Sequence, residues 1–325
     1  MSVLVFIELN EGTIKKSALE AVSYAVVTAS KMNAQCEAII LEPCAESEAQ
    51  KLSAYGVSKI TLVKDEKLKF LDAAACSKAI SFHAKKMGAS VIVFSMSDSG
   101  KAIAPVLSAQ LQAGLVAGAI DYPDTTGGKF IVKKNVFSGK AFAFCEIKSE
   151  IKIVSLVPNA VSPVLNNVTV QIETVESGLT ESDYKIKIEK QEKATGEISL
   201  TDADIVVSGG RGMKGPENWG MLEEMAKILG AATACSRPVA DTHWRPHHEH
   251  VGQTGFTVRP NLYIAIGISG AIQHLAGVNG SKIIVVINKD AEAPFFKAAD
   301  YGIVGDAFEV VPKLNEAFKK FKQHN

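Results

Sequence analysis

Short apolar runs alternate with amphipathic stretches along the first part of the chain. Four runs have the length and β-branched content of buried strands: residues 3–9, 36–42, 59–63 and 91–95. Two longer stretches, residues 13–32 and 70–87, have helical spacing and lie between these runs. Buried strands joined by helices are typical of a parallel sheet covered on both faces. The pattern therefore predicts a Rossmann-like N-terminal α/β domain.

The pattern changes after Tyr122. Three apolar runs follow at residues 129–137, 140–147 and 151–158, and short polar turns rather than helices separate them. We expect antiparallel strands that complete the first domain. Residues 166–191 are polar and extended, and the segment after them is rich in charge, Gly and Thr. We place the domain boundary near residue 195, which gives domains at residues 1–195 and 196–325.

A second α/β pattern begins at Asp204. Its apolar runs predict strands at residues 204–208, 233–236, 262–267, 282–287 and 308–312. Helical stretches are expected at residues 217–230, after Ser269, near residues 293–299 and at the C-terminus. This half has enough apolar strands for its own core, so we expect a second, doubly wound α/β domain.

Composition excludes several classes of function. Hydrophobic residues make up 47% and charged residues 22%, while Lys+Arg and Asp+Glu are equal at 35 each. Such a chain lacks the broad positive field of nucleic-acid-binding proteins, so we expect no nucleic acid as partner. Its 5 cysteines are odd in number and form no CxxC pair, which fits thiols in a reducing compartment.

The sequence also carries no visible targeting signal. No apolar run approaches the ~20 residues of a membrane helix, and no signal peptide or Arg/Ser-rich transit segment is evident at the N-terminus. We expect a soluble protein of the bacterial cytoplasm rather than of the mitochondrial matrix.

Glycine-rich or polar loops follow the strands of the second domain, where ligands of parallel sheets bind. In GISGAIQH, Gly267 and Gly270 allow a sharp turn and close approach of a ligand. Ser269 suits a phosphate oxygen beside the amides of a helix N-terminus. The same stretch also fits a plain strand-to-helix turn with a serine cap. Spacing alone leaves both interpretations open.

Other candidate side chains have equally ordinary alternatives. Arg211 in GGRG is a ligand contact or a surface arginine, and Arg237 in CSRP is a ligand contact or a loop salt bridge. His274 alone also fits a helix histidine with a local hydrogen bond, and Asp306 fits a loop carboxylate.

Four histidines cluster in DTHWRPHHEH: His243, His247, His248 and His250. They suggest a metal site or a solvent-exposed loop. Pro246 breaks any helix that would align two of them, and zinc spacing is absent, which favours the loop. P-loop, GxSxG and HExxH signatures are also absent. We therefore expect no metal and no catalytic residue for a substrate of the chain's own.

The ordered set GGRG, CSRPVAD, VGQTG, LYIAIGISGAIQHLAG, INKD and DYGIVGD resembles the electron-transfer flavoprotein α subunit. This resemblance extends from about residue 204 almost to the end, whereas the first domain matches mainly in outline. The first domain has SGKAIAP where family members often carry a GRDLAP-like stretch. The histidine-rich loop of the second domain is also atypical. The resemblance implies a C-terminal domain that binds extended FAD and an N-terminal domain that contacts the partner.

The resemblance also assigns roles to residues. It implies that residues 269–274 line the pyrophosphate and ribityl region, that His274 lies near the flavin N1–C2=O edge, and that Thr254 lies near N5. A cation or donor at that edge favours an anionic semiquinone, and Arg237 packs against the ring system. The implied FAD-binding residues are Arg211, Ser236, Arg237, Val251, Gly252, Gln253, Thr254, Ser269, Gly270, Ala271, Ile272, Gln273, His274, Asn288, Asp306 and Ala307.

The implied function is that of an electron carrier rather than an enzyme. In this family a heterodimer with a β subunit moves electrons, largely one at a time, from flavin dehydrogenases such as the acyl-CoA dehydrogenases of fatty acid β-oxidation to a membrane quinone oxidoreductase. AMP, or a second FAD in bifurcating relatives, belongs mainly to the β subunit. The alternatives are a self-contained flavin- or NAD-dependent dehydrogenase and a nucleotide-binding regulatory module. Arg237, Thr254 and His274 together favour the carrier.

Overall fold

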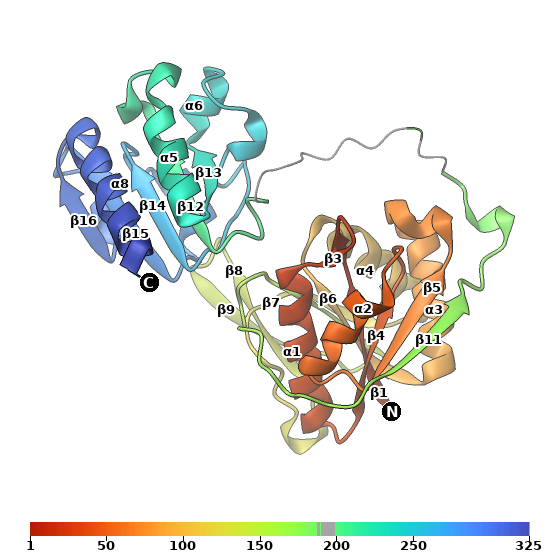
Figure 1. Ribbon diagram of the computed structural model, residues 1–325. Coiled ribbons are helices and arrows are strands. Elements are labelled where there is room, and N and C mark those ends of the chain that lie inside the picture. Colours follow the sequence, from red (N-terminus) through yellow and green to blue (C-terminus); the bar gives the residue numbers. More distant parts are fainter. Residues whose placement is uncertain (187–188, 190–198, 325) are drawn as a thin grey trace. The chain divides into compact units, whose positions relative to one another are not determined.

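A computed structural model describes residues 1–186, 189 and 199–324 (Figure 1). The chain has two compact units, Met1–Val136 with Lys140–Lys193 and Ala194–Asn325 with Phe137–Gly139. The boundary predicted near residue 195 lies outside the described residues. Each unit is built around its own sheet.

The N-terminal unit contains a nine-stranded sheet in the order β11-β5-β4-β1-β6-β10-β7-β8-β9. Its strands are β1 (Ser2–Ile7), β4 (Gln35–Ile40), β5 (Lys59–Lys64), β6 (Ala89–Ser95), β7 (Gly114–Ala119), β8 (Ile131–Val136), β9 (Ala141–Glu146), β10 (Lys152–Leu156) and β11 (Gln171–Glu176). A small hairpin, β2 (Leu9–Asn10) with β3 (Thr13–Ile14), follows β1. Among the described strands of the large sheet, only the β7–β8 and β8–β9 pairings are antiparallel, so the predicted parallel-dominated sheet is confirmed.

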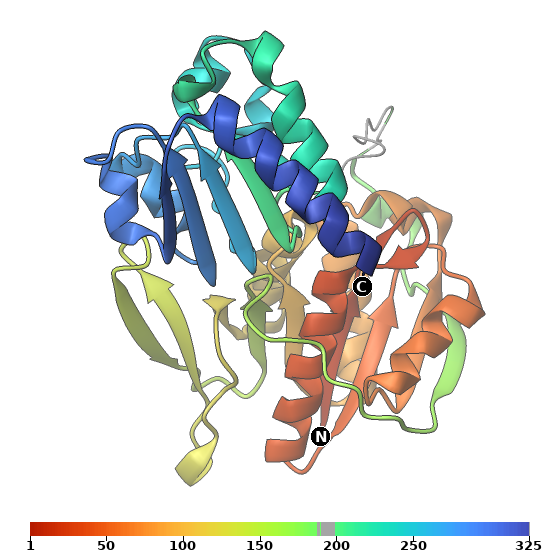
Figure 2. The ribbon, with the colours of Figure 1, turned by 60° about the vertical axis from the view of Figure 1, so that its left-hand side comes forward.

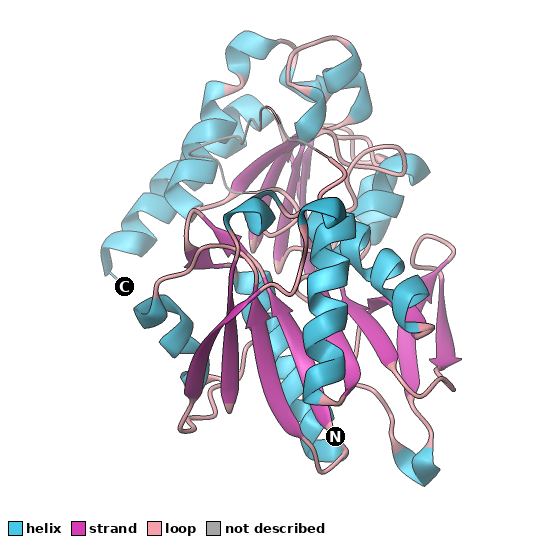
Figure 3. Cartoon of the chain, turned by 90° about the vertical axis from the view of Figure 1, so that its right-hand side faces the viewer, coloured by secondary structure: helices cyan, strands magenta, loops and turns pink. Residues whose placement is uncertain are grey.

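Helices cover both faces of this sheet (Figure 3). Val3, Val5 and Ile7 of β1 pack in the cluster that includes α1 (Lys16–Lys31). Leu4 and Phe6 pack in the opposite cluster, against α3 (Ala73–Met87) and α4 (Asp98–Leu111). Burial on both faces explains the continuous apolar runs, because successive strand side chains point to opposite sides. The short elements are α2 (Glu46–Ala49), η1 (Gln50–Ala54), η2 (Glu66–Phe70), η3 (Thr126–Gly128) and η4 (Glu181–Asp183).

One strand differs from the sequence prediction. Residues 151–158 were expected to form an antiparallel strand, but β10 runs parallel between β6 and β7. The reason is its burial: Ile153, Val154, Ser155 and Leu156 are all buried, so both faces of the strand need cover, as they have in the middle of a helix-covered parallel sheet. The antiparallel prediction holds for the β8–β9 hairpin.

The C-terminal unit contains a parallel five-stranded sheet in the order β13-β12-β14-β15-β16. Its strands are β12 (Ile205–Gly209), β13 (Ala232–Cys235), β14 (Leu262–Ile266), β15 (Ile283–Asn288) and β16 (Tyr301–Val304). Figure 2 shows α8 (Ala307–His324) beside α5 (Gly220–Leu229) on one face. Shorter helices are α6 (Arg237–Asp241), α7 (Ile272–Val278), η5 (Arg211–Met213), η6 (Pro216–Asn218), η7 (His247–Glu249) and η8 (Pro294–Ala298). The predicted second α/β unit is confirmed.

The prediction of the last strand of this unit is wrong. Residues 308–312 lie inside α8, and the fifth strand is β16 instead. Asp306 explains the helix start, because its Oδ1 accepts the Phe308 N–H at 2.9 Å, as a capping carboxylate does. Ala307, Val311 and Asn315 are buried at helical spacing. Capping and packing therefore outweigh the strand preference of the β-branched residues Val310 and Val311.

All five cysteines are free, and Cys36, Cys76 and Cys235 are buried core residues. Burial raises the pKa of the Cys235 thiol to about 12, which keeps it protonated. Within the described ranges, no helix combines the length and the apolar character that crossing a bilayer requires.

Candidate functional site

The loops at the carboxyl ends of β12, β13, β14 and β15 enclose a cavity of about 520 Å³ in the C-terminal unit. Parallel strands bring these ends to one edge of the sheet, where ligands of such sheets bind. Its lining residues are Arg211, Gly212, Ser236, Arg237, Pro238, His250, Val251, Gly252, Gln253, Thr254, Gly267, Ile268, Ser269, Ala271, Gln273, His274, Asn288 and Asp290.

This pocket brings together all but four of the binding residues expected from the sequence. The four are Gly270, Ile272, Asp306 and Ala307. Gly270 packs so closely on η8 that a Cβ there would lie 2.4 Å from Cβ of Phe295. Ile272 is exposed, Asp306 caps α8, and Ala307 is buried among core residues. These four do not line the cavity, and their assignment as FAD contacts stays a prediction.

Closely packed glycines form one wall. The Gly212 N–H donates to the Gly267 carbonyl at 3.0 Å. A Cβ on Gly210 would lie 2.3 Å from that carbonyl oxygen, and Gly267 itself has a left-handed φ of 63°. The two strand-end turns can meet only without side chains at these positions. This contact brings Arg211 and Ser269 to the same pocket.

Ser269 does not cap the helix that follows it, as the serine of an ordinary strand-to-helix turn would. Helix α7 begins at Ile272, and its N-cap residue, Ala271, makes no side-chain capping bond. Ser269 is exposed on the pocket wall, while its backbone carbonyl accepts the Phe295 N–H at 3.1 Å. The serine-cap interpretation is therefore wrong, and the hydroxyl faces the pocket region without that bond.

His274 is a buried titratable side chain of the pocket wall, with 7% of its surface exposed. Its Nε2 lies 2.9 Å from the Tyr263 hydroxyl. Burial first, and then the charge of His250, lower the pKa of His274 to about 4, against a smaller opposing effect of the Val251 carbonyl. The ring is therefore neutral near pH 7, so it can act toward a ligand as a donor but not as a cation.

The hydrogen bond of His274 also determines which ring nitrogen is free. Burial raises the pKa of Tyr263, which keeps its hydroxyl protonated. When this hydroxyl donates to Nε2, Nδ1 carries the ring proton. That Nδ1 atom is buried and makes no hydrogen bond of ordinary geometry among the described residues, although the Val251 carbonyl lies close enough to raise the pKa of the ring. A buried, unused donor at a pocket wall is the kind of group that a ligand satisfies.

The position of Arg237 is compatible with both alternatives that its sequence left open. It lines the pocket, and its Nε also lies 3.3 Å from Oδ2 of Asp241. The side chain is 62% exposed, so this pair contributes little to stability. The guanidinium remains available to a ligand.

The pocket lining also contains residues that are not among the FAD contacts implied by the sequence: Gly212, Pro238, His250, Gly267, Ile268 and Asp290. His250 is the most informative. His243, His247 and His248 are exposed, as expected for a solvent loop, but His250 is 7% exposed and lines the pocket. In the sequence, the position of His250 directly before VGQTG could have indicated that it lies at the pocket.

The histidine-rich loop is anchored by a buried ion pair. Arg245 Nε lies 2.8 Å from Oε2 of Glu249, and Arg245 Nη1 lies 2.7 Å from Oε1 of Glu223 on α5. Glu249 also accepts a hydrogen bond from Thr233 of β13 at 3.1 Å. Among the described residues, no group of three or more His, Cys, Asp or Glu side chains is arranged to hold a metal ion.

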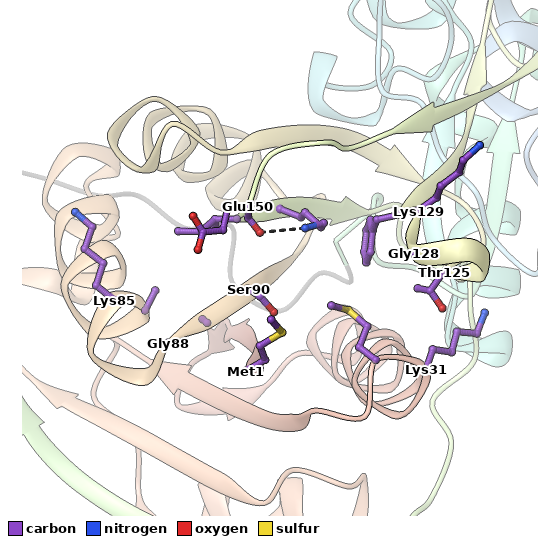
Figure 4. A pocket seen from close by; sticks show the side chains of 15 residues that line it. Met1, Lys31, Lys85, Gly88, Ser90, Thr125, Gly128, Lys129 and Glu150 are labelled. Atoms are coloured by element: carbon purple, nitrogen blue, oxygen red, sulfur yellow. Dashed lines mark hydrogen bonds between the residues drawn. The ribbon is translucent and has the colours of Figure 1, made fainter.

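A second cavity, of about 650 Å³, lies in the N-terminal unit (Figure 4). It is found where β1, β6 and β10 begin and where α1 and α3 end. Lys31 and Lys152 donate to the carbonyls of Pro123 and Ser149 at 2.7 and 2.9 Å. Figure 4 shows the amino groups of Lys85 and Lys129 pointing away from each other. Lys31 and Lys152 thus pair with carbonyl groups, and Lys85 and Lys129 do not converge on one point.

Comparison with known proteins agrees with this geometry. Residues 3–180 match the "Electron transfer flavoprotein domain" and residues 199–279 match the "Electron transfer flavoprotein FAD-binding domain". The electron transfer flavoprotein subunit alpha of Bacillus subtilis is 37% identical over 99% of both chains. That of Thermoanaerobacterium thermosaccharolyticum is 35% identical over 98% of both.

A third relative matches part of the chain more strongly. The mitochondrial alpha subunit of Dictyostelium discoideum is 52% identical over 151 residues, which cover 46% of this chain and 42% of that protein. Two domain matches and two full-length relatives give one assignment. The chain belongs to the family of electron transfer flavoprotein alpha subunits, which carry electrons rather than catalyse a reaction of their own.

Proposed function

We propose that the chain binds one FAD in the 520 Å³ pocket and carries electrons, largely one at a time, between flavin dehydrogenases and a quinone oxidoreductase. The observation that carries this proposal is the unused buried Nδ1 of His274 at the wall of that pocket. FAD supplies the redox chemistry when it is bound. The chain's own residues bind it, orient it and tune its charge.

The residues present suit such a cofactor. The Gly210–Gly267 contact leaves backbone exposed to a close ligand, and Ser269 offers a hydroxyl to the pyrophosphate. Arg211 and Arg237 provide positive charge for phosphate and for a reduced ring. We assign the remaining contacts to Ser236, Val251, Gly252, Gln253, Thr254, Ala271, Gln273 and Asn288.

We assign His274 and Thr254 to the redox end of the cofactor. A neutral imidazole that donates from Nδ1 stabilises negative charge on the ring edge without first having to acquire a proton. Thr254 is exposed at the tip of the glycine-flanked turn and offers a hydroxyl. A donor at this end stabilises a one-electron-reduced ring, which is what an electron carrier requires.

The family assignment implies a beta-subunit partner. We propose a heterodimer in which the beta subunit holds AMP or a second FAD, with acyl-CoA dehydrogenases as electron donors in the cytoplasm. The boundary between the two domains is proposed near residue 195.

The test is an anaerobic titration of the chain co-expressed with a beta subunit. Stepwise addition of dithionite should give a red flavin radical in high yield. Reduction by NADH or a small substrate in one two-electron step, with no radical, would contradict the carrier. A complex that binds no flavin would contradict the cofactor assignment and favour the regulatory module.

A further inference from the structure

His250 lines the same pocket as His274, and the function proposed above leaves it without a role. Its backbone is fixed on both sides. The Val251 N–H donates to the Cys235 carbonyl at 3.0 Å, and the Phe256 N–H donates to the His250 carbonyl at 2.8 Å. The side chain is therefore attached to the edge of the central sheet and not to a freely moving loop.

The VGQTG turn closes around the His250 ring. A Cβ on Gly255 would lie 2.8 Å from ring atoms Cγ and Nδ1, and a Cβ on Gly252 would lie 3.4 Å from Nε2. The turn is held against α7 by the Gln253 N–H, which donates to the Gln273 carbonyl at 2.7 Å. Two glycines thus make room for this ring beneath the turn that carries Thr254.

The ring nitrogens of His250 make no hydrogen bond to another side chain or backbone group in the part of the chain that the structure describes. Charged and titratable groups face the ring from three elements. They are Arg237 and Asp241 on α6, His247 on η7 and His274 on α7. Burial first, then Arg237 and to a smaller extent His247, lower the pKa of His250, while Asp241 opposes them.

The two pocket histidines differ in their capacity for a proton. If the Tyr263 hydroxyl donates to Nε2 of His274, the lone pair of that nitrogen is already in use. Burial also lowers the pKa of His274 to about 4, far from neutrality. His250 keeps a free ring nitrogen. When negative charge appears in the pocket, His250 therefore binds a proton more readily than His274 does.

We propose that His250 takes up one proton from solvent when the flavin in this pocket accepts one electron, and thereby couples the flavin potential to pH. This inference rests on the proposed function. The electron comes from a dehydrogenase or, in the assay, from dithionite. The proton binds the free lone pair of the His250 ring, and no other bond forms or breaks.

The sign follows from linkage. Negative charge on the reduced flavin raises the pKa of His250, so protons are taken up between its values in the oxidised and reduced states. Within that window the one-electron potential falls as pH rises. The limit is a tenfold change in the reduction equilibrium per pH unit, which is 59 mV for a one-electron couple. Outside the window the slope from this group disappears.

The experiment measures the one-electron potential of the FAD-loaded heterodimer from pH 5 to 8 in the unmodified protein and in His250→Gln, His274→Gln and His248→Gln. His248 is exposed in the same loop and does not line the pocket, so it is the matched control. We expect a pH slope in the unmodified protein, in His248→Gln and in His274→Gln, and its loss in His250→Gln. A slope that survives in His250→Gln, or one that is lost only in His274→Gln, would overturn the inference.

A second measurement needs no substitution at the site. In the complex with 13C-labelled histidine, NMR should show a higher pKa for His250 in the reduced protein than in the oxidised one. Equal values would overturn the inference even if His250→Gln failed to fold. A complex without flavin would instead refute the proposed function, so the two failures are distinguishable.

Discussion

The hydroxyl of Tyr263 lies 2.9 Å from Nε2 of His274, and both side chains are buried, Tyr263 completely. Tyr263 belongs to β14 and His274 to α7. This hydrogen bond therefore fixes the orientation of the His274 ring relative to β14, the middle strand of the sheet. Phe295 packs against both rings, with centroid separations of 6.4 Å and 5.7 Å.

Tyr263→Phe should lower the free energy of unfolding by about 1–3 kcal/mol, because Nε2 of His274 then remains buried without a partner. It should also weaken flavin binding, since both tautomers of the ring become accessible. Urea denaturation and flavin titration measure the two effects. Tyr301→Phe, at a tyrosine that is 65% exposed, serves as control and should change neither.

His274→Ala should lower the yield of flavin radical while FAD stays bound. The loss of one donor removes stabilisation of the charged ring but leaves the arginines and glycines that hold the phosphates. Anaerobic titration followed by absorbance and EPR measures the yield. An unchanged yield would remove His274 from its assigned role.

The stability of the C-terminal unit should decrease as the pH falls from about 6.5 to 4. The pKa of His274 is lowered to about 4 in the folded protein, whereas an unfolded histidine titrates near 6.5. The unfolded chain therefore binds more protons in this window, and folding is favoured at its upper end. A shift of this size corresponds to roughly 3 kcal/mol at most.

Chemical denaturation at several pH values tests this. His250 also has a lowered pKa and adds to the slope of this unit in the same direction, whereas His83, which also has a lowered pKa, belongs to the N-terminal unit. The comparison is therefore with His274→Gln, which should show a clearly smaller slope. Parallel curves for the two proteins would contradict the prediction.

Gly210→Ala should abolish flavin binding and destabilise the fold by about 2 kcal/mol or more, because its Cβ would lie 2.3 Å from the Gly267 carbonyl oxygen. The two nearest backbone atoms belong to the Gly267 carbonyl, which cannot move away as the end of a flexible side chain can. Gly220→Ala is the matched control: nothing lies within 4 Å of a Cβ there, and the residue is in helix α5. That change should stabilise slightly. Thermal melts and flavin content would separate the two, and equal behaviour would be inconsistent with this account.

Arg245→Met should destabilise the C-terminal unit by about 3 kcal/mol, since it leaves the nearly buried Glu249 carboxylate without its cation. The double variant Arg245→Met/Glu249→Gln should recover most of the loss, because no unpaired charge remains. Denaturation curves of the three proteins test this. A double variant no more stable than the single one would show that the ion pair is not the cause.

The site was more predictable from sequence than parts of the fold. Glycine-rich loops after parallel strands meet at one edge by the geometry of the sheet, so Arg211, Thr254 and His274 could be grouped without coordinates. His250 could not be added, because its burial depends on a backbone bond to Cys235 and on the turn that closes over its ring. The direction of β10 depends on neighbours distant in sequence. An apolar run by itself does not reveal them.

The central position of β10 constrains the order in which the protein can be made. Strands β6 and β7 do not pair with each other, since β10 separates them, and β10 is synthesised only after the β8–β9 hairpin. In a nascent chain that has been synthesised past β7, the edges of β6 and β7 that later pair with β10 therefore stay unpaired until residue 156 has left the ribosome. Fragments that end within the hairpin should be prone to aggregate or to require chaperones, because exposed edges of this kind pair with other chains.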